Sequence, residues 1–291
     1  MADAPSLPDP RDEYAALVRA VAARLELERS FGLDAVSVPE PPPPPAPQAQ
    51  APPRRRAAPR TAAPKPTPAR PAPRKPTGPP THVSTARSTN LFEAKDYDIK
   101  IPDGLSKQEQ LDFLANAISG CELCPLHAGR TKMVFGAGNP DADLMFIGEA
   151  PGRDEDLQGI PFVGRAGQLL TKIIEAIEFT RDDVYIANIN KCRPPNNRAP
   201  LPEEMSRCLP FLLRQVEIVE PKVICLLGAT AVRGLLQVKE GITKLRGKFL
   251  EWRGVLVMPT FHPAYLLRNP AGKRDVWSDV QQVRDAVRGT K

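Results

Sequence analysis

Continuous apolar runs alternate with amphipathic segments along the last two thirds of the chain. The runs 144–147, 184–189 and 222–227 are almost wholly apolar, as in strands buried on both faces, and two shorter apolar segments, 247–253 and 255–258, flank Gly254. Between and around these runs, apolar residues recur at helical spacing in segments 105–119, 166–177, 202–219, 229–236 and 274–287. Strands that alternate with helices predict an α/β fold, with a mostly parallel sheet covered by helices on both faces.

The first third of the chain has a different pattern. Segment 11–31 carries an apolar stripe that predicts an amphipathic helix, which must bury this stripe on the following domain, a second copy or a partner protein. Segment 41–80 consists almost entirely of Pro, Ala, Arg, Lys and Thr, which predicts a disordered, partly polyproline II tether. We therefore expect three parts: an N-terminal helical segment (1–38), a disordered basic Pro/Ala-rich linker (39–90) and a globular domain (91–291).

The positive charge is concentrated in the linker. Nine Lys and Arg residues and no acid lie between Pro41 and Thr89, whereas the net charge of the whole chain is +6, so the remainder is acidic overall. Such a tether either holds a polyanion nearby without reading its sequence or serves as a soluble spacer. No apolar stretch is long enough to span a membrane, and no basic segment followed by an apolar core follows Met1, so we expect a cytoplasmic protein.

A glycine- and acid-rich loop follows the first buried strand. Segment 148–156 reads Gly-Glu-Ala-Pro-Gly-Arg-Asp-Glu-Asp, and segment 159–165, Gly-Ile-Pro-Phe-Val-Gly-Arg, leads into the next helix. Open α/β sheets bind ligands at the carboxyl ends of their strands, so this loop is a candidate site. Its acids, Glu149, Asp154, Glu155 and Asp156, are alternatively ligands for Mg²⁺ or a solvated surface.

Four of the five cysteines are arranged to share one metal centre. Cys121 and Cys124 form a C-x-x-C pair, Cys192 follows a predicted strand, and Cys208 lies on the next predicted helix. Four thiolates satisfy either a zinc ion or an iron–sulfur cubane, and the spacing does not separate these two. Cys225 lies inside an apolar run and is expected to be a core residue.

His262 follows the last predicted strand directly, so we expect it at the edge of the sheet. It begins the segment His-Pro-Ala-Tyr-Leu-Leu-Arg. We expect Tyr265, Leu266 and Leu267 to be exposed beside Arg268, where they would suit a wedge inserted into a base stack.

Together these motifs resemble the family 4, or iron–sulfur, uracil-DNA glycosylases. The resemblance covers about residue 105 to the C-terminus. It rests on the loop 148–152 with Glu155 and Asp156, on segment 161–164, on Asn188 with segment 190–195, on segment 262–264, and on the four cysteines.

The resemblance implies a three-layer α/β/α fold with a central four-stranded mostly parallel sheet. It implies a structural [4Fe-4S] cluster held by Cys121, Cys124, Cys192 and Cys208. It also implies hydrolysis of the N-glycosidic bond of deoxyuridine in single- or double-stranded DNA, which initiates base excision repair. We expect the protein to be a monomer. The uracil-binding residues would be Glu149, Ala150, Phe162, Asn188 and His262, and the DNA-binding residues Tyr265, Leu266 and Arg268.

Within this resemblance, His262, Glu149 and Glu155 are the predicted catalytic residues. The best-known branch of the superfamily has an Asp where this chain has Ala150, so the water-activating group is expected to be Glu155 or Glu149. No basic insertion precedes His262, unlike in the branch that bonds covalently to abasic DNA, so turnover is expected. Two other functions stay open: a non-catalytic DNA-binding adaptor, and a metal-dependent phosphohydrolase that uses the acidic loop.

Overall fold

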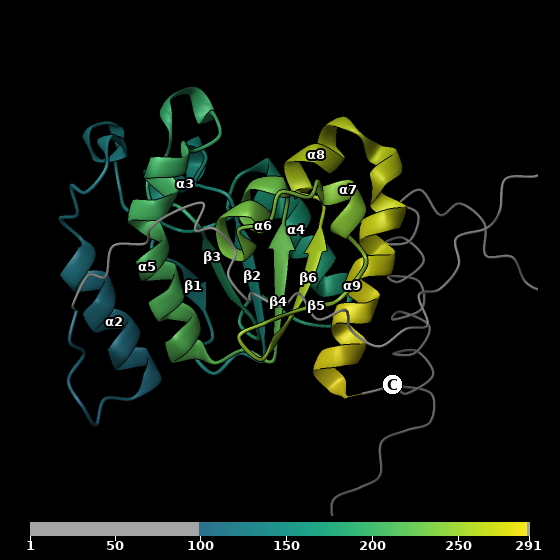
Figure 1. Ribbon diagram of the computed structural model, residues 1–291, viewed down its shortest axis with the longest axis horizontal. Coiled ribbons are helices and arrows are strands. Elements are labelled where there is room, and N and C mark those ends of the chain that lie inside the picture. Colours follow the sequence, from purple (N-terminus) through teal and green to yellow (C-terminus); the bar gives the residue numbers. More distant parts are fainter. Residues whose placement is uncertain (1–98, 290–291) are drawn as a thin grey trace, which may run out of the picture. The chain divides into compact units, whose positions relative to one another are not determined.

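The computed structural model describes residues 99–289, and this part of the chain contains one six-stranded sheet (Figure 1). Its strands are β1 (Ala137–Gly138), β2 (Leu144–Gly148), β3 (Tyr185–Asn188), β4 (Val223–Leu227), β5 (Leu250–Trp252) and β6 (Val255–Thr260). They lie in the order β1-β3-β2-β4-β6-β5. The four central strands are parallel, and β1 and β5 are antiparallel to their neighbours.

The described residues therefore hold a mixed, mostly parallel sheet that is wider than the four strands expected. The four parallel strands are present, but each edge carries one additional short antiparallel strand. β5 reaches its position through a tight hairpin, because Arg253 and Gly254 both adopt positive φ angles and reverse the chain into β6. β1 has only two residues, too few for any periodic pattern to reveal it.

Helices cover both faces of the sheet. They are α2 (Lys107–Ile118), α3 (Arg153–Gln158), α4 (Arg165–Ala176), α5 (Pro202–Val219), α6 (Ala229–Leu236), α7 (Ile242–Leu245), α8 (Pro263–Arg268) and α9 (Lys273–Arg288), with 3₁₀ turns η1 (Pro125–Gly129), η2 (Pro195–Asn197) and η3 (Pro270–Gly272). The N-terminus of α2 has the capping box expected from its sequence, in which Ser106 and Glu109 bind each other's backbone amides.

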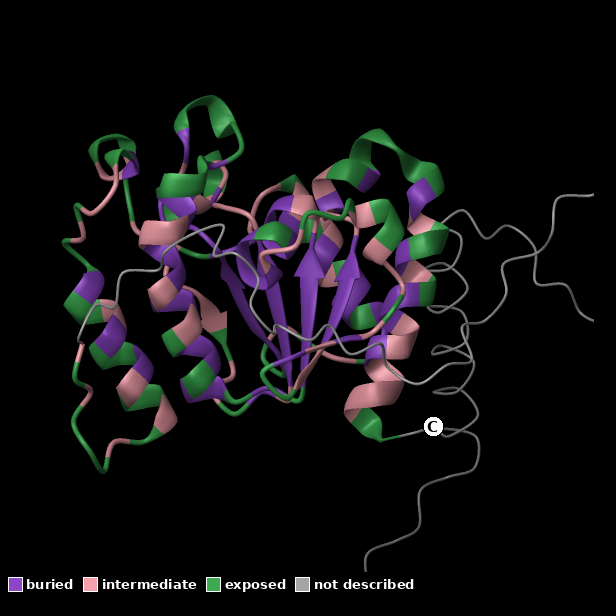
Figure 2. Cartoon of the chain, in the orientation of Figure 1, coloured by how far each residue is buried: buried purple, intermediate pink, exposed green. Residues whose placement is uncertain are grey.

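Successive residues of each central strand face opposite sides of the sheet, which divides the core into two layers. Met145 and Ile147 of β2 pack with residues of α2, α5 and α6, whereas Leu144 and Phe146 pack with residues of α4, α8 and α9. The central strands are buried on both faces, as the purple arrows in Figure 2 show. This double burial explains why these strands are continuous apolar runs in the sequence.

The N-terminal helix predicted within 1–38 and the predicted linker 39–90 lie outside the described residues. The described part of the predicted domain 91–291 begins at residue 99. Among the helices of this part, none combines the length and apolar character needed to cross a membrane.

Candidate active site

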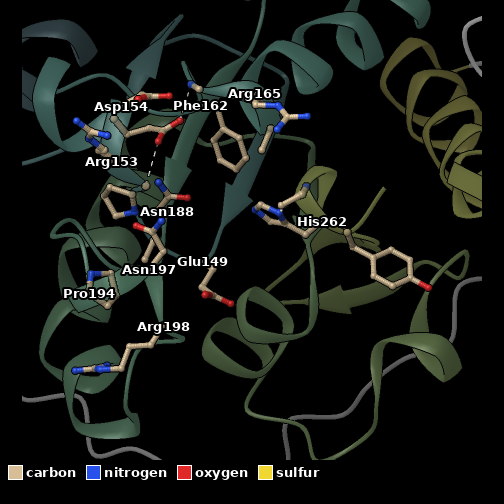
Figure 3. Close-up of a pocket in the computed structure, with 18 of the residues that line it drawn as sticks. Glu149, Arg153, Asp154, Phe162, Arg165, Asn188, Pro194, Asn197, Arg198 and His262 are labelled. Carbon is tan, nitrogen blue, oxygen red and sulfur yellow. Dashed lines mark hydrogen bonds between the residues drawn. The ribbon is translucent and has the colours of Figure 1, made fainter. Parts of the chain in front are cut away.

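A cavity of about 620 Å³ opens at the carboxyl ends of the parallel strands. The helices α3 and α8 lie at this edge of the sheet (Figure 1). Its walls come from the loop after β2, the N-terminus of α4, the end of β3, the loop before α5, and α8. The side chains of Phe162, Asn188 and His262, which come from three separate segments, line this one cavity (Figure 3). The acidic loop and the segment after β6 are thus brought together, as expected from their positions after parallel strands.

Gly148, the last residue of β2, is the point around which two of these side chains converge. It pairs in register with Asn188 on β3. A Cβ at position 148 would lie 2.4 Å from Asn188 Oδ1 and 2.5 Å from Phe162 Cζ. Only glycine leaves room for both side chains, so the first residue of the acidic-loop motif is required by packing.

Asn188 presents an unpaired polar atom to the cavity. Its side chain is buried, and its Oδ1 has no hydrogen-bond partner within the described structure. Buried amide oxygens are almost always hydrogen-bonded, and an exception requires an explanation. A ligand with an N–H group at this position would supply the missing donor.

His262 occupies the N-cap position of α8, and its ring faces the cavity (Figure 3). The Nδ1 atom accepts a hydrogen bond of 3.1 Å from the backbone amide of Ala264. Nδ1 therefore carries no hydrogen, and Nε2 of the neutral ring carries it. Burial, with a smaller contribution from the positive charge of Arg268, lowers the pKa of His262 from 6.5 to about 4. The ring is thus a neutral hydrogen-bond donor, 5.6 Å from the Phe162 ring between centroids.

The lowered pKa of His262 predicts how the stability of the fold depends on pH. Between pH 6.5 and about 4 the unfolded chain binds a proton at this position that the folded chain does not, so stability decreases as the pH falls through this window. We expect the thermal unfolding midpoint to drop less in His262→Gln than in the wild type between about pH 7 and about pH 5. An equal drop in both proteins would contradict the shifted pKa.

The carboxylate of Glu155 is fully engaged by the backbone. Its Oε2 accepts a hydrogen bond from the Gly152 amide at 3.1 Å, and its Oε1 accepts two from the Val163 and Gly164 amides, each at 2.9 Å. Glu155 therefore joins the acidic loop to the segment that carries Phe162, and its oxygens are not free to activate water. Asp156 is buried and accepts a hydrogen bond from the Thr131 amide, away from the cavity.

Glu149 and Ala150 follow β2 directly and line the cavity. The Glu149 side chain is partly buried, and no described residue donates a hydrogen bond to its carboxylate, in contrast to Glu155. Its own backbone carbonyl accepts a hydrogen bond from the Asn190 amide, which fixes the start of the loop against the end of β3. Of the two predicted catalytic carboxylates, Glu149 is thus the one whose oxygens are not bound by backbone amides of the described residues.

The expectation of an exposed Leu266 was wrong. Leu266 lies on α8 and is fully buried in the core layer that contains α4 and α9, whereas Tyr265 and Leu267 are about two fifths exposed. Successive residues on a helix point about 100° apart, so three consecutive side chains cannot share one exposed face. Tyr265 and Arg268 line the cavity, and the Tyr265 ring packs against Phe261 at a centroid distance of 4.9 Å.

The four cysteines predicted to share a centre lie around a second, small pocket. Cys121 and Cys124 precede η1, Cys192 follows β3, and Cys208 lies on α5; all four are free thiols. Cys225 is buried in β4, away from this pocket, as expected of a core residue. Among the described residues, no three His, Cys, Asp or Glu side chains are grouped to hold one metal ion.

Two cationic side chains flank the cysteine pocket. Arg130 donates a hydrogen bond to Cys192 Sγ at 3.4 Å and another to the Cys121 carbonyl at 2.7 Å. Lys191 is buried, and its Nζ donates to the Asn188 carbonyl at 3.0 Å and to Gln215 Oε1. Neither of these two partners of Lys191 is an acid. Buried cations require a compensating negative charge, so four thiolates bound to a metal centre fit this environment.

Burial raises the pKa of the Cys208 thiol to about 12 and lowers the pKa of Lys191 to about 8. Both shifts have the same cause, because a low-dielectric environment disfavours the charged form of each group. Lys191 is the residue of this region that sequence reasoning missed. The signal available was its place between Asn188 and Cys192, in the buried segment that follows β3.

Comparison with known proteins defines the class to which this fold and cavity belong. Residues 135–281 match the family model described as the Uracil DNA glycosylase superfamily. The matched segment contains the whole sheet and every residue that lines the large cavity.

Relatives narrow this class further. The type-4 uracil-DNA glycosylase of Thermotoga maritima is 46% identical over 187 residues, which are 63% of this chain and 97% of the relative. Those of Saccharolobus solfataricus and Archaeoglobus fulgidus are each 43% identical, over 62% and 60% of this chain and 87% and 92% of their own lengths. The chain therefore belongs to the type-4 uracil-DNA glycosylases, and the resemblance inferred from its motifs is confirmed.

Proposed function

We propose that this uracil-DNA glycosylase of DNA repair hydrolyses the N-glycosidic bond of deoxyuridine after the base is extruded into the large cavity. The products are free uracil and an abasic site, which base excision repair then processes. The observation that carries this proposal is the buried, unpaired Oδ1 of Asn188, a residue that lines the same cavity as Phe162 and His262.

The cavity offers uracil a stacking surface and a hydrogen-bonding edge. An extruded base can stack on the ring of Phe162, which forms one wall of the cavity. Asn188 Oδ1 then accepts the N3–H of uracil, and its amide N–H₂ donates to O4. Cytosine presents the opposite pattern at this edge, so it would leave the buried amide unpaired. Backbone amides after Gly148, including that of Ala150, can supply further donors to the base.

Bond cleavage leaves negative charge on O2 of the departing uracil, and His262 is placed to stabilise it. Since Nδ1 is occupied by the Ala264 amide, the Nε2–H group is the one that points at the base. A neutral donor that is already oriented in a partly buried site stabilises a developing anion without reorganisation. The sugar acquires positive charge at the same time.

Glu149 is the carboxylate that we assign to water and to the sugar cation. Glu149 lines the cavity and no described residue donates a hydrogen bond to its carboxylate, whereas the oxygens of Glu155 accept hydrogen bonds from three backbone amides. A carboxylate at this position can orient an attacking water molecule and offset the oxocarbenium charge. Glu155 instead has a positioning role, because it holds the Phe162 segment against the acidic loop.

Arginines at the mouth of the cavity are suited to the DNA backbone. Arg153, Arg165 and Arg268 line the cavity and are exposed, and no described residue forms an ion pair with them. Contacts to phosphates position a protein on DNA without reading sequence. Tyr265, which lines the cavity and is exposed on α8, can fill the gap that the extruded base leaves.

Cys121, Cys124, Cys192 and Cys208 are proposed to hold a [4Fe-4S] cluster. When bound, such a cluster would cross-link the segment before η1, the segment after β3 and α5, and hydrolysis would need no electron transfer from it. A cubane has four separate iron atoms, each of which takes one thiolate, so its ligands surround a group larger than a single ion. The flanking Arg130 and Lys191 offset the negative charge of the thiolates.

The cysteine assignment predicts a contrast between two buried cysteines. Cys208→Ser is expected to lose bound iron and the visible sulfur-to-iron absorbance, because it removes one of four ligands. Cys225→Ser is the matched control: it replaces an equally buried cysteine that lies in β4 and should keep both signals. Iron analysis and visible spectra of the purified proteins measure the difference. A colourless wild-type protein that carries zinc would contradict the cluster.

Glycosylase activity is tested with a single-stranded oligonucleotide that contains one uracil, incubated with the wild-type protein in EDTA and then treated with alkali. Strand scission at the uracil, absent from a matched oligonucleotide with thymine, is the expected result. Intact DNA would favour a binding adaptor instead, and scission only after addition of Mg²⁺ would favour a phosphohydrolase. Parallel assays on duplex DNA determine the strand preference.

A further inference from the structure

Phe162 has a backbone conformation that requires external support. Its φ angle is +54°, in the left-handed region that residues with side chains rarely adopt. The ring is buried at the wall of the cavity, so the unusual backbone is what directs it there. Residues held in such regions persist only when the surrounding structure fixes them.

Arg181 supplies this support on the carbonyl side. Its Nη2 donates a hydrogen bond of 2.8 Å to the Pro161 carbonyl, and its Nη1 donates one of 3.1 Å to the Phe162 carbonyl. The Pro161 carbonyl belongs to the peptide before Phe162 and the Phe162 carbonyl to the peptide after it. One planar guanidinium therefore fixes both peptide planes, and with them both φ and ψ of Phe162.

Two further contacts confine the same segment. The Glu155 carboxylate accepts hydrogen bonds from the Val163 and Gly164 amides. These N–H groups directly follow the two carbonyls that Arg181 binds, so an anion and a cation fix adjacent parts of the same segment. Behind them, α4 passes so close that a Cβ at Gly167 would lie 1.9 Å from the Phe162 carbonyl oxygen. Arg181 also donates to Thr171 Oγ1 on α4, which orients the guanidinium.

We propose that Arg181 is a positioning residue for base recognition, which acts on catalysis only by holding the Phe162 ring in its stacking orientation. The inference rests on the proposed function, because it assumes that Phe162 stacks on the extruded uracil. Arg181 does not line the cavity and has no role in the proposed chemistry. Lysine could reach one of the two carbonyls but could not fix both peptide planes.

A double-mutant cycle tests this role. Arg181→Met is expected to lower kcat/KM on uracil-containing DNA about 10-fold in the wild-type background. In the Phe162→Ala background the same change should have almost no effect, because the ring that Arg181 positions is absent. Arg181→Lys should give a smaller loss than Arg181→Met. If Arg181→Met does not fold, Arg181→Lys still tests the positioning role in the same two backgrounds.

Controls separate this inference from general destabilisation and from the proposed function. Arg214→Met removes a surface arginine that pairs with Glu217 on α5, and it should leave kcat/KM unchanged. If Arg181→Met lowers kcat/KM by the same factor in the wild-type and the Phe162→Ala backgrounds, its effect is structural. The positioning role is then overturned, while the glycosylase mechanism stands. If Phe162→Ala itself retains full activity, the stacking role is wrong and this inference falls with it.

Discussion

The His262→Ala variant is expected to cleave uracil from DNA about 10²–10³-fold more slowly than the wild type, with little change in DNA affinity. The neutral ring donates from Nε2, because Nδ1 accepts the Ala264 amide, and the acceptor at O2 becomes strongly basic only as the bond breaks. The interaction is therefore worth much more in the transition state than in the bound ground state. The loss should appear in the chemical step.

Single-turnover kinetics with protein in excess over DNA isolate that step. His262→Asn keeps a donor on a shorter side chain and should recover part of the rate. Because His262 also caps α8, its removal costs about 1 kcal/mol of stability, so unfolding must be measured for each variant. An unchanged single-turnover rate in a folded His262→Ala protein would remove the anion-stabilising role from this residue.

The sequence was sufficient to predict where the site lies. Uninterrupted apolar runs predict the four central strands, because a strand buried on both faces has no polar alternation. The carboxyl ends of parallel strands meet at one edge of a sheet, so Glu149, Asn188 and His262, which each end or follow a strand, were expected near each other. They line the same cavity in the structure.

Features that depend on helix phase or on distant partners could not be predicted in this way. Leu266 was assigned to an exposed wedge, but the direction of one side chain on a six-residue helix depends on how α8 packs on α4 and on the sheet. Glu155 was equal to Glu149 as a candidate for water activation, because a sequence does not show which carboxylate accepts backbone amides.

Long-range contacts account for the other omissions. Arg181 lies outside every motif, and its importance depends on a contact with the Phe162 segment some 19 residues earlier in the chain. Lys191 would be expected to be exposed on the basis of its charge alone, yet it is buried between the end of β3 and α5. Both cations contact backbone carbonyls of residues that line the cavity, Phe162 and Asn188, and so connect the recognition residues to the scaffold.

Asn188→Ala is expected to lower kcat/KM on uracil-containing DNA by about 100-fold or more. The variant removes both the acceptor for N3–H and the donor for O4, and it leaves a vacant space at the edge of the base. Since a buried amide without a partner is the basis of discrimination, the ratio of activity on uracil to activity on cytosine should also shrink. Matched oligonucleotides that contain uracil or cytosine at one position measure both effects.

Asn190→Ala provides the matched control, because Asn190 is equally buried and lies two residues further along the chain. Its Nδ2 donates to the Glu204 carbonyl, its Oδ1 also has no hydrogen-bond partner among the described residues, and the residue does not line the cavity. Its loss should reduce stability while most of the activity of the folded protein is retained. Equal losses of kcat/KM in the two variants would mean that the end of β3 matters only as scaffold. A selective loss in Asn188→Ala would establish that Asn188 Oδ1 has no protein partner because the N3–H group of uracil is its hydrogen-bond donor.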